Sequence, residues 1–149
     1  MNIADLASAP GRRFPAGRLS QRLVGPGLPI AADGFCLGHV ILDPSGGQVP
    51  WHCHPNEEIY MVLEGEAEIV VSQDVQTLSA GQVVYIPGGE YHQLTNRSNR
   101  AVRFLYCYSP SGDVDHWRQE LDGTLARAGV DAPCLPSGAA PQFSGGESE

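Results

Sequence analysis

Three histidines and one glutamate of this chain stand at spacings that could bring them to one metal ion: His52, His54, Glu58 and His92. His52 and His54 are separated by one residue, so on an extended strand their imidazoles point to the same face. Glu58 and Tyr60 repeat this spacing in an apolar segment typical of a β-strand, which places a carboxylate beside a phenol. Imidazole nitrogens and carboxylate oxygens are good ligands for divalent transition metals. These residues therefore indicate a metal site.

The same residues belong to two sequence motifs that together contain ten fixed positions. The motifs are Gly46-x5-His52-x-His54-x3-Glu58-x6-Gly65 and Gly81-x5-Pro87-x-Gly89-x2-His92-x3-Asn96. At all ten positions they match the two signature motifs of the cupin superfamily, so the chain resembles a cupin over roughly residues 35–110. The resemblance implies an all-β fold, the double-stranded β-helix or jelly-roll barrel, with His52, His54, Glu58 and His92 as ligands of a metal inside it.

Such a ligand set would leave the ion free to bind a substrate. Three neutral imidazoles and one carboxylate leave a divalent ion with a residual charge of about +1 and, in six-coordinate geometry, with open positions. A substrate bound there through oxygen is polarised, which stabilises the negative charge that develops when a proton is removed. Mixed nitrogen and oxygen ligands accept Fe, Mn, Ni, Zn, Co and Cu, so we expect one divalent transition metal as cofactor without naming it.

Tyr60 is the candidate catalytic residue. Its phenol should enter the pocket beside Glu58, where a nearby cation would favour the phenolate and make it a general base; the alternative is a core tyrosine hydrogen-bonded to a ligand. The set His52, His54, Glu58, Tyr60 and His92 resembles that of the cupin-type dimethylsulfoniopropionate lyases. In those enzymes the metal holds the substrate carboxylate and the tyrosine takes the α-proton, which expels dimethyl sulfide and leaves acrylate. The resemblance implies lyase or isomerase chemistry on a small carboxylate or keto acid.

Two other functions stay open at this point. With iron, the same open positions could take substrate and dioxygen, as in a dioxygenase, and a cupin can also bind a metabolite without turnover. Composition excludes other classes. The 149 residues carry a formal net charge of −8, which argues against nucleic acid or an anionic membrane as partner, and contain no lysine, which excludes Schiff-base chemistry. We expect a small-molecule substrate and a cytoplasmic location.

The chain divides into four predicted segments. Residues 1–29, rich in Pro, Gly and Arg, suggest a solvated arm or a strand added to a second subunit. Residues 30–110 should form the barrel, 111–130 a helix, and 131–149 a flexible tail. Eighteen Gly and twelve Pro suit an all-β protein with many tight turns. Because small barrels with exposed edge strands commonly pair, we expect a homodimer.

Three further expectations concern individual side chains. His39 falls on an early strand outside both motifs, and we interpret it as a packed or surface histidine rather than a fifth ligand. The last strand alternates so that Val102, Phe104, Tyr106 and Tyr108 share one face, which is typical of core residues. Apolar residues recur every three or four positions after Gly112, which predicts a helix of four turns with Asp113 as its N-cap.

Overall fold

The fold comes from a computed structural model that describes residues 1–112 and 114–131. Within these ranges the chain forms ten strands followed by one short helix. Their bounds are β1 Gly11–Phe14, β2 Arg18–Val24, β3 Cys36–Leu42, β4 Gln48–His52, β5 Glu57–Glu64, β6 Glu66–Val71, β7 Asp74–Ser79, β8 Val83–Ile86, β9 His92–Thr95, β10 Val102–Ser109 and α1 His116–Leu121.

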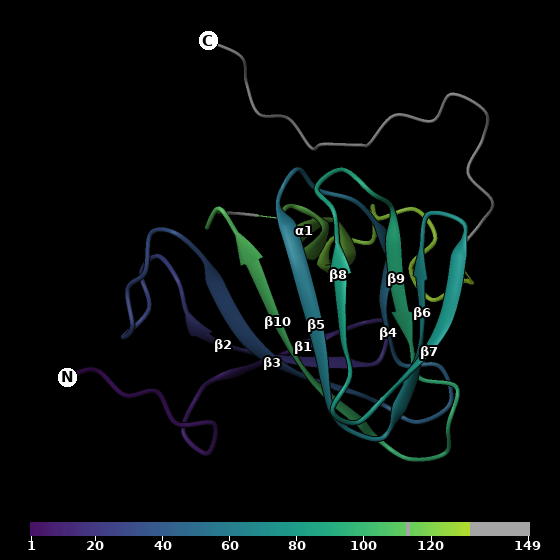
Figure 1. The fold of residues 1–149 in the computed structure, drawn as a ribbon, viewed down its shortest axis with the longest axis horizontal. Coiled ribbons are helices and arrows are strands. Elements are labelled where there is room, and N and C mark those ends of the chain that lie inside the picture. Colours follow the sequence, from purple (N-terminus) through teal and green to yellow (C-terminus); the bar gives the residue numbers. More distant parts are fainter. Residues whose placement is uncertain (113, 132–149) are drawn as a thin grey trace, which may run out of the picture.

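Two antiparallel sheets face each other and form a jelly-roll barrel (Figure 1). One has six strands in the order β1-β2-β3-β10-β5-β8, and the other has four in the order β4-β9-β6-β7. In the view of Figure 1 the helix α1 lies behind the upper parts of β5 and β8, near one end of the barrel. The predicted fold class, an all-β jelly-roll barrel with one helix after it, is therefore confirmed.

Alternation along the strands builds the core between the sheets. On β10 the side chains of Val102, Phe104, Tyr106 and Tyr108 are buried while the residues between them are partly or fully exposed, as the sequence predicted. Phe104 is completely buried. Because each strand turns one face inward, every second residue of β5 and β10 reaches the same interior.

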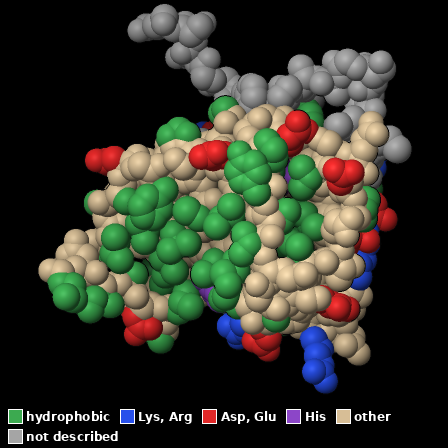
Figure 2. Space-filling model, in the orientation of Figure 1, with side chains coloured by type: hydrophobic (Ala, Val, Ile, Leu, Met, Phe, Trp, Pro, Cys, Tyr) green, Lys and Arg blue, Asp and Glu red, His purple; other side chains and the backbone are tan. Residues whose placement is uncertain are grey.

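The opposite face of the six-stranded sheet is unusually apolar. Ile59 and Leu63 of β5, together with Val83 and Tyr85 of β8, are 39, 43, 53 and 57% exposed. Figure 2 shows hydrophobic side chains gathering on the face that this sheet presents. An antiparallel sheet with one solvated face normally carries polar residues there, so these apolar residues are candidates for contact with a partner.

The N-terminal region differs from the solvated arm expected for residues 1–29. Residues 11–24 form β1 and β2, and β2 pairs with β3 of the same chain from Arg18 to Val24. Arg18, which looked like one of several solvated charges, points into the barrel and is 2% exposed. Burial is possible because its guanidinium has a carboxylate partner, Glu120, which lies about a hundred residues away along the chain.

The helix is shorter than the four turns predicted. It spans the six residues of α1, and Gly123 follows with φ of +72°. A glycine in this left-handed conformation commonly ends a helix, so the apolar repeat that continues to Ala128 does not extend it. The predicted N-cap, Asp113, lies outside the described residues, and Asp115 holds that position.

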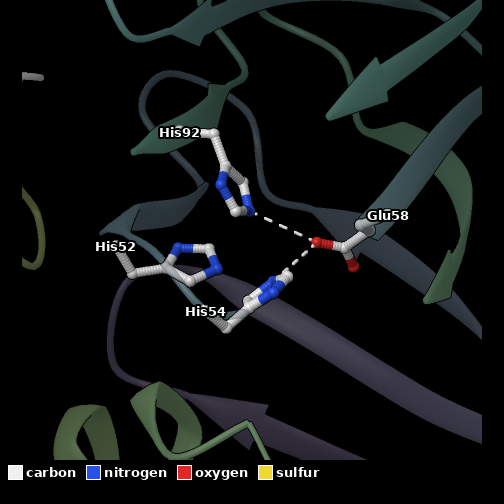
Figure 3. A group of neighbouring side chains, drawn as sticks. All are labelled: His52, His54, Glu58 and His92. Carbon is white, nitrogen blue, oxygen red and sulfur yellow. Dashed lines mark hydrogen bonds and ion pairs between the residues drawn. The ribbon is translucent and has the colours of Figure 1, made fainter. Parts of the chain in front are cut away.

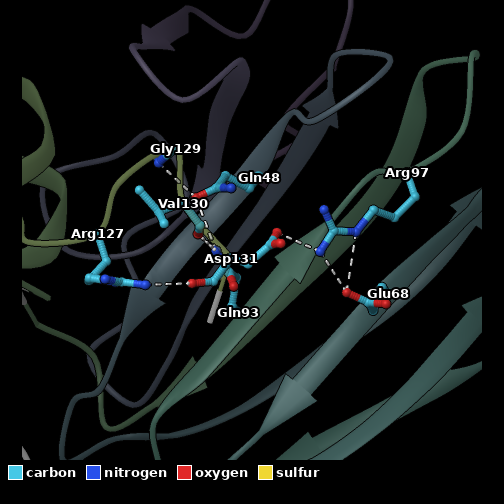
Figure 4. Close-up of polar contacts among 8 residues, drawn as sticks. All are labelled: Gln48, Glu68, Gln93, Arg97, Arg127, Gly129, Val130 and Asp131. Carbon is cyan, nitrogen blue, oxygen red and sulfur yellow. Dashed lines mark hydrogen bonds and ion pairs between the residues drawn. The ribbon is translucent and has the colours of Figure 1, made fainter. Parts of the chain in front are cut away.

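The chain after α1 returns to the outer side of the four-stranded sheet (Figure 4). The Gln48 side-chain oxygen accepts a hydrogen bond from the Gly129 backbone at 2.9 Å, and the Gln93 amide donates to the Val130 carbonyl at 2.8 Å. These bonds anchor residues 127–131. The tail expected over 131–149 lies outside the described residues except for its first. Among the described residues, no helix is both long and apolar enough to cross a membrane.

Candidate metal centre

The four residues expected to be ligands come from both sheets and lie together inside the barrel. His52 ends β4 and is paired directly with His92, the first residue of β9, while His54 follows two residues after His52. Glu58 projects from β5 of the facing sheet (Figure 3). One ligand atom from each residue lies within 4.8 Å of the others, and all four side chains are buried.

Two turns hold the motifs against each other. The Gly89 backbone N–H donates to the His54 carbonyl at 2.7 Å, which ties the turn before β9 to the segment that carries His54. Gly88 packs so closely there that a Cβ would lie 2.2 Å from the Pro55 carbonyl oxygen. A side chain at this position is therefore excluded, which explains a glycine beside the motif position Gly89.

Backbone carbonyls orient all three imidazoles in the same way. The Nδ1 atoms of His52, His54 and His92 lie 2.6, 3.1 and 2.9 Å from the carbonyl oxygens of Pro50, Asn56 and Glu90. A carbonyl oxygen only accepts hydrogen bonds, so each Nδ1 carries a proton and donates it. The neutral imidazole then presents an unprotonated Nε2, which is the tautomer that binds metals.

These Nε2 atoms converge on the carboxylate. Glu58 Oε2 lies 3.0 Å from His54 Nε2 and 3.2 Å from His92 Nε2, and His52 Nε2 is buried without a hydrogen-bond partner. Lone pairs of nitrogen and oxygen repel at such distances unless a positive charge lies between them. One proton can bridge a single nitrogen–oxygen pair, whereas one divalent cation can be coordinated by all four side chains. The donor set therefore fits a metal ion.

Burial governs the protonation of the group. Burial and the neighbouring imidazoles, His116 first among them, hold the pKa of His52 well below its usual value. Burial alone would raise the pKa of Glu58. A proton on Nε2 of His54 or His92, in place of a metal ion, would outweigh burial through hydrogen bonds and positive charge, and the pKa then lies below the usual value. Neutral His52 and ionised Glu58 are the forms that bind a metal.

Tyr60 lies where the sequence placed it, on the same face of β5 as Glu58. Both side chains line one cavity, and Tyr60 is 2% exposed, with its ring against His92 and Phe104. Burial and the Glu58 carboxylate raise the pKa of the phenol well above 10. Without a cation beside it the phenol therefore keeps its proton, and a bound divalent ion would act in the opposite direction.

Residues outside the motifs complete the cavity. Arg18 of β2 and both His116 and Trp117 of α1 line it, and the remaining space has room for about one water molecule. The His116 ring stacks on His52 with 3.7 Å between centroids. Burial, followed by the charge of Arg18, holds the pKa of His116 well below the usual value. Sequence reasoning missed His116 because its helix follows both motifs and no spacing links it to them.

His39 lies apart from this group. It is buried on β3, and its Nδ1 lies 3.1 Å from the side-chain oxygen of Gln21. Among the described residues the metal-competent cluster holds only the four residues named above. His39 is thus a packed histidine.

Comparison with known proteins identifies the fold family. A family model described as a cupin domain matches residues 38–108. Tetracenomycin polyketide synthase protein TcmJ of Streptomyces glaucescens is 32% identical over 109 residues, which cover 72% of this chain and 70% of that protein. The polyketide cyclase RemF from Streptomyces resistomycificus superposes with a TM-score of 0.64 at 25% identity, covering 74% of this chain and 80% of that one.

A lyase is also similar, over a shorter stretch. Dimethylsulfoniopropionate lyase DddQ of Ruegeria pomeroyi is 39% identical over 71 residues, which are 47% of this chain. The match spans 35% of that protein, so about two thirds of its length has no counterpart in the comparison.

Proposed function

The chain belongs to the cupin family, and we propose that it is a metal-dependent enzyme that removes a proton beside the carboxylate of a small metabolite. His52, His54, Glu58 and His92 would hold one divalent transition metal. When bound, the metal would supply a site for the substrate carboxylate and stabilise the charge that develops on it. The convergent, buried donor set supports this part of the proposal.

Tyr60 is the proposed general base, and its position carries the proposal. Its phenol shares the buried cavity with Glu58, so it lies beside the place where a metal-bound carboxylate would sit. The phenolate oxygen would take the α-proton, and the electron pair left on carbon would form a double bond and expel a β-leaving group. In an isomerase the proton would return at another carbon. The buried side chains around Glu58 and Tyr60 would limit the access of water to this step.

The test is turnover of a panel of carboxylates with β-leaving groups, among them dimethylsulfoniopropionate, by protein loaded with Fe, Mn, Ni or Zn in turn. Unsaturated product is followed by chromatography. We expect Tyr60→Phe to keep its metal and lose turnover. Tyr85→Phe is the matched control, because Tyr85 is 57% exposed on the outer face of β8, and it should keep turnover. Turnover by Tyr60→Phe would remove Tyr60 as the base, and oxygen uptake by the iron-loaded protein would support a dioxygenase instead.

A second candidate is ring closure of a polyketide, and the similarity to the polyketide cyclase RemF and to the polyketide synthase protein TcmJ favours it. Its chemistry also begins with proton removal beside a carbonyl group, so the same base and metal would serve. A polyketone that cyclises faster with the wild-type protein than with Tyr60→Phe would select this candidate.

We also propose a homodimer formed through the outer face of the six-stranded sheet. The exposed apolar residues of β5 and β8 lie beside an open edge, since β8 ends the sheet. Light scattering should give twice the chain mass of 15.9 kDa. Val83→Asp should give monomers, whereas Val75→Asp, an equally exposed position on β7, should not. A monomeric wild-type protein would contradict the dimer.

A further inference from the structure

A buried guanidinium faces the candidate metal centre. Arg18 of β2 is 2% exposed and lines the same cavity as Glu58 and Tyr60. It donates to the Gln48 carbonyl at 3.2 Å, and its charge lies 4.0 Å from the centroid of the Phe14 ring. Taking a cation out of water costs several kcal/mol, so a buried arginine beside a substrate cavity requires an anion as partner.

The anion in this structure comes from the helix that covers the cavity. Glu120 of α1 places Oε2 2.7 Å from the Arg18 guanidinium, and its other oxygen accepts from the Ala16 backbone at 3.3 Å. Burial raises the pKa of Glu120 and lowers that of Arg18, because desolvation disfavours the charged form of each group. The attraction and the hydrogen bond between the two side chains oppose this cost. A free carboxylate with good geometry could replace Glu120 at the guanidinium.

Substrate entry would separate this pair. With α1 in place the cavity has room for about one water molecule, which is too small for a metabolite. His116, Trp117 and Glu120 all belong to α1, and the first two line the cavity. A shift of α1 that opens the cavity therefore also withdraws Glu120 and leaves Arg18 in need of another anion.

We propose that Arg18 binds a second carboxylate of the substrate, and that Glu120 occupies this position until the substrate displaces it. The inference rests on the proposed function, in which the first carboxylate goes to the metal. It names the substrate class as small dicarboxylates. A guanidinium at this end of the cavity repels a cationic group, so a sulfonium or ammonium substituent is disfavoured there.

Binding of succinate and butyrate to zinc-loaded protein, measured by calorimetry at one pH, tests the assignment. The two acids have the same chain length and differ by one carboxylate. We expect succinate to bind at least about tenfold tighter than butyrate, the gain of one charge-assisted contact. Glu120→Gln should widen this ratio, because it removes the competing charge and keeps the shape. Arg18→Met/Glu120→Leu removes both charges of the pair, so it should fold, and the ratio of succinate affinity to butyrate affinity should fall to about one.

The outcomes separate the two proposals. If succinate and butyrate bind with equal affinity to the wild type and to Glu120→Gln, the proposed role of Arg18 is overturned. The proposal that the metal binds a substrate carboxylate would still stand. A succinate preference that survives in Arg18→Met/Glu120→Leu also overturns the role of Arg18. If neither acid binds to zinc-loaded protein, the proposed function fails and the dicarboxylate inference fails with it.

Discussion

Removing one partner of the Arg18–Glu120 pair should destabilise the fold far more than removing both. The two side chains are 2 and 0% exposed, so either single change leaves an uncompensated charge in the interior. A buried pair broken in this way costs about 3–5 kcal/mol, whereas its replacement by apolar residues of similar volume is nearly neutral. We therefore expect Arg18→Met and Glu120→Leu each to lose about 3–5 kcal/mol, and the double variant to lose less than either.

Urea unfolding of the four proteins, followed by circular dichroism, gives the free energies of this cycle. For a chain of this size the single changes correspond to a fall in Tm of about 6–20 °C. Arg103→Met is the matched control, because Arg103 pairs with Glu64 on the surface and is 47% exposed. It should change stability by less than about 1 kcal/mol. A double variant that loses the sum of the two single losses would refute the coupling and the anchoring of α1 by this pair.

Two further predictions concern the site. In the metal-free protein the folded-state pKa values of His52 and His116 lie well below 6.5, so the unfolded chain binds more protons in acid. The free energy of unfolding should be greatest above pH 6.5 and should fall at lower pH, with a slope approaching about 2.7 kcal/mol per pH unit, about 1.36 for each histidine. Urea unfolding between pH 7.5 and 5.5 measures this profile. A free energy that does not change over this range would contradict the prediction. Gly88→Ala should cost about 1–3 kcal/mol and weaken metal binding, because its Cβ would collide with Pro55, whereas Gly34→Ala, with open space around it, should do neither; equal effects would refute the close approach.

The sequence predicts the strands and the faces of the site residues from local rules, whereas the barrel that brings His92 to the other three ligands is implied by the resemblance to cupins. A period of two places His52 and His54 on one face, and the same period places Glu58 beside Tyr60. The turns that bring the two motifs together need glycine, and Gly65 and Gly81 have φ values of +82° and +89°. Because the backbone of these turns requires glycine, the spacing of the glycines in the sequence locates the turns.

The missed features depend on contacts between distant parts of the chain. Arg18 looks like a surface charge until its partner Glu120 is known, so β2 could not be recognised as a strand of the barrel. His116 reaches His52 only because α1 folds over the end of the barrel. The helix itself ends early at Gly123, where backbone conformation overrides an apolar repeat that continues beyond it. No sequence period reports such pairings.

Metal content tests the central claim most directly. Elemental analysis of purified wild-type protein should give about one equivalent of a divalent transition metal per chain. His54→Ala and His92→Ala should lose it while remaining folded, because the apolar core supplies most of the stability. His39→Ala, a buried histidine outside the quartet, should keep it. A His54→Ala or His92→Ala protein that still holds one equivalent would contradict the account.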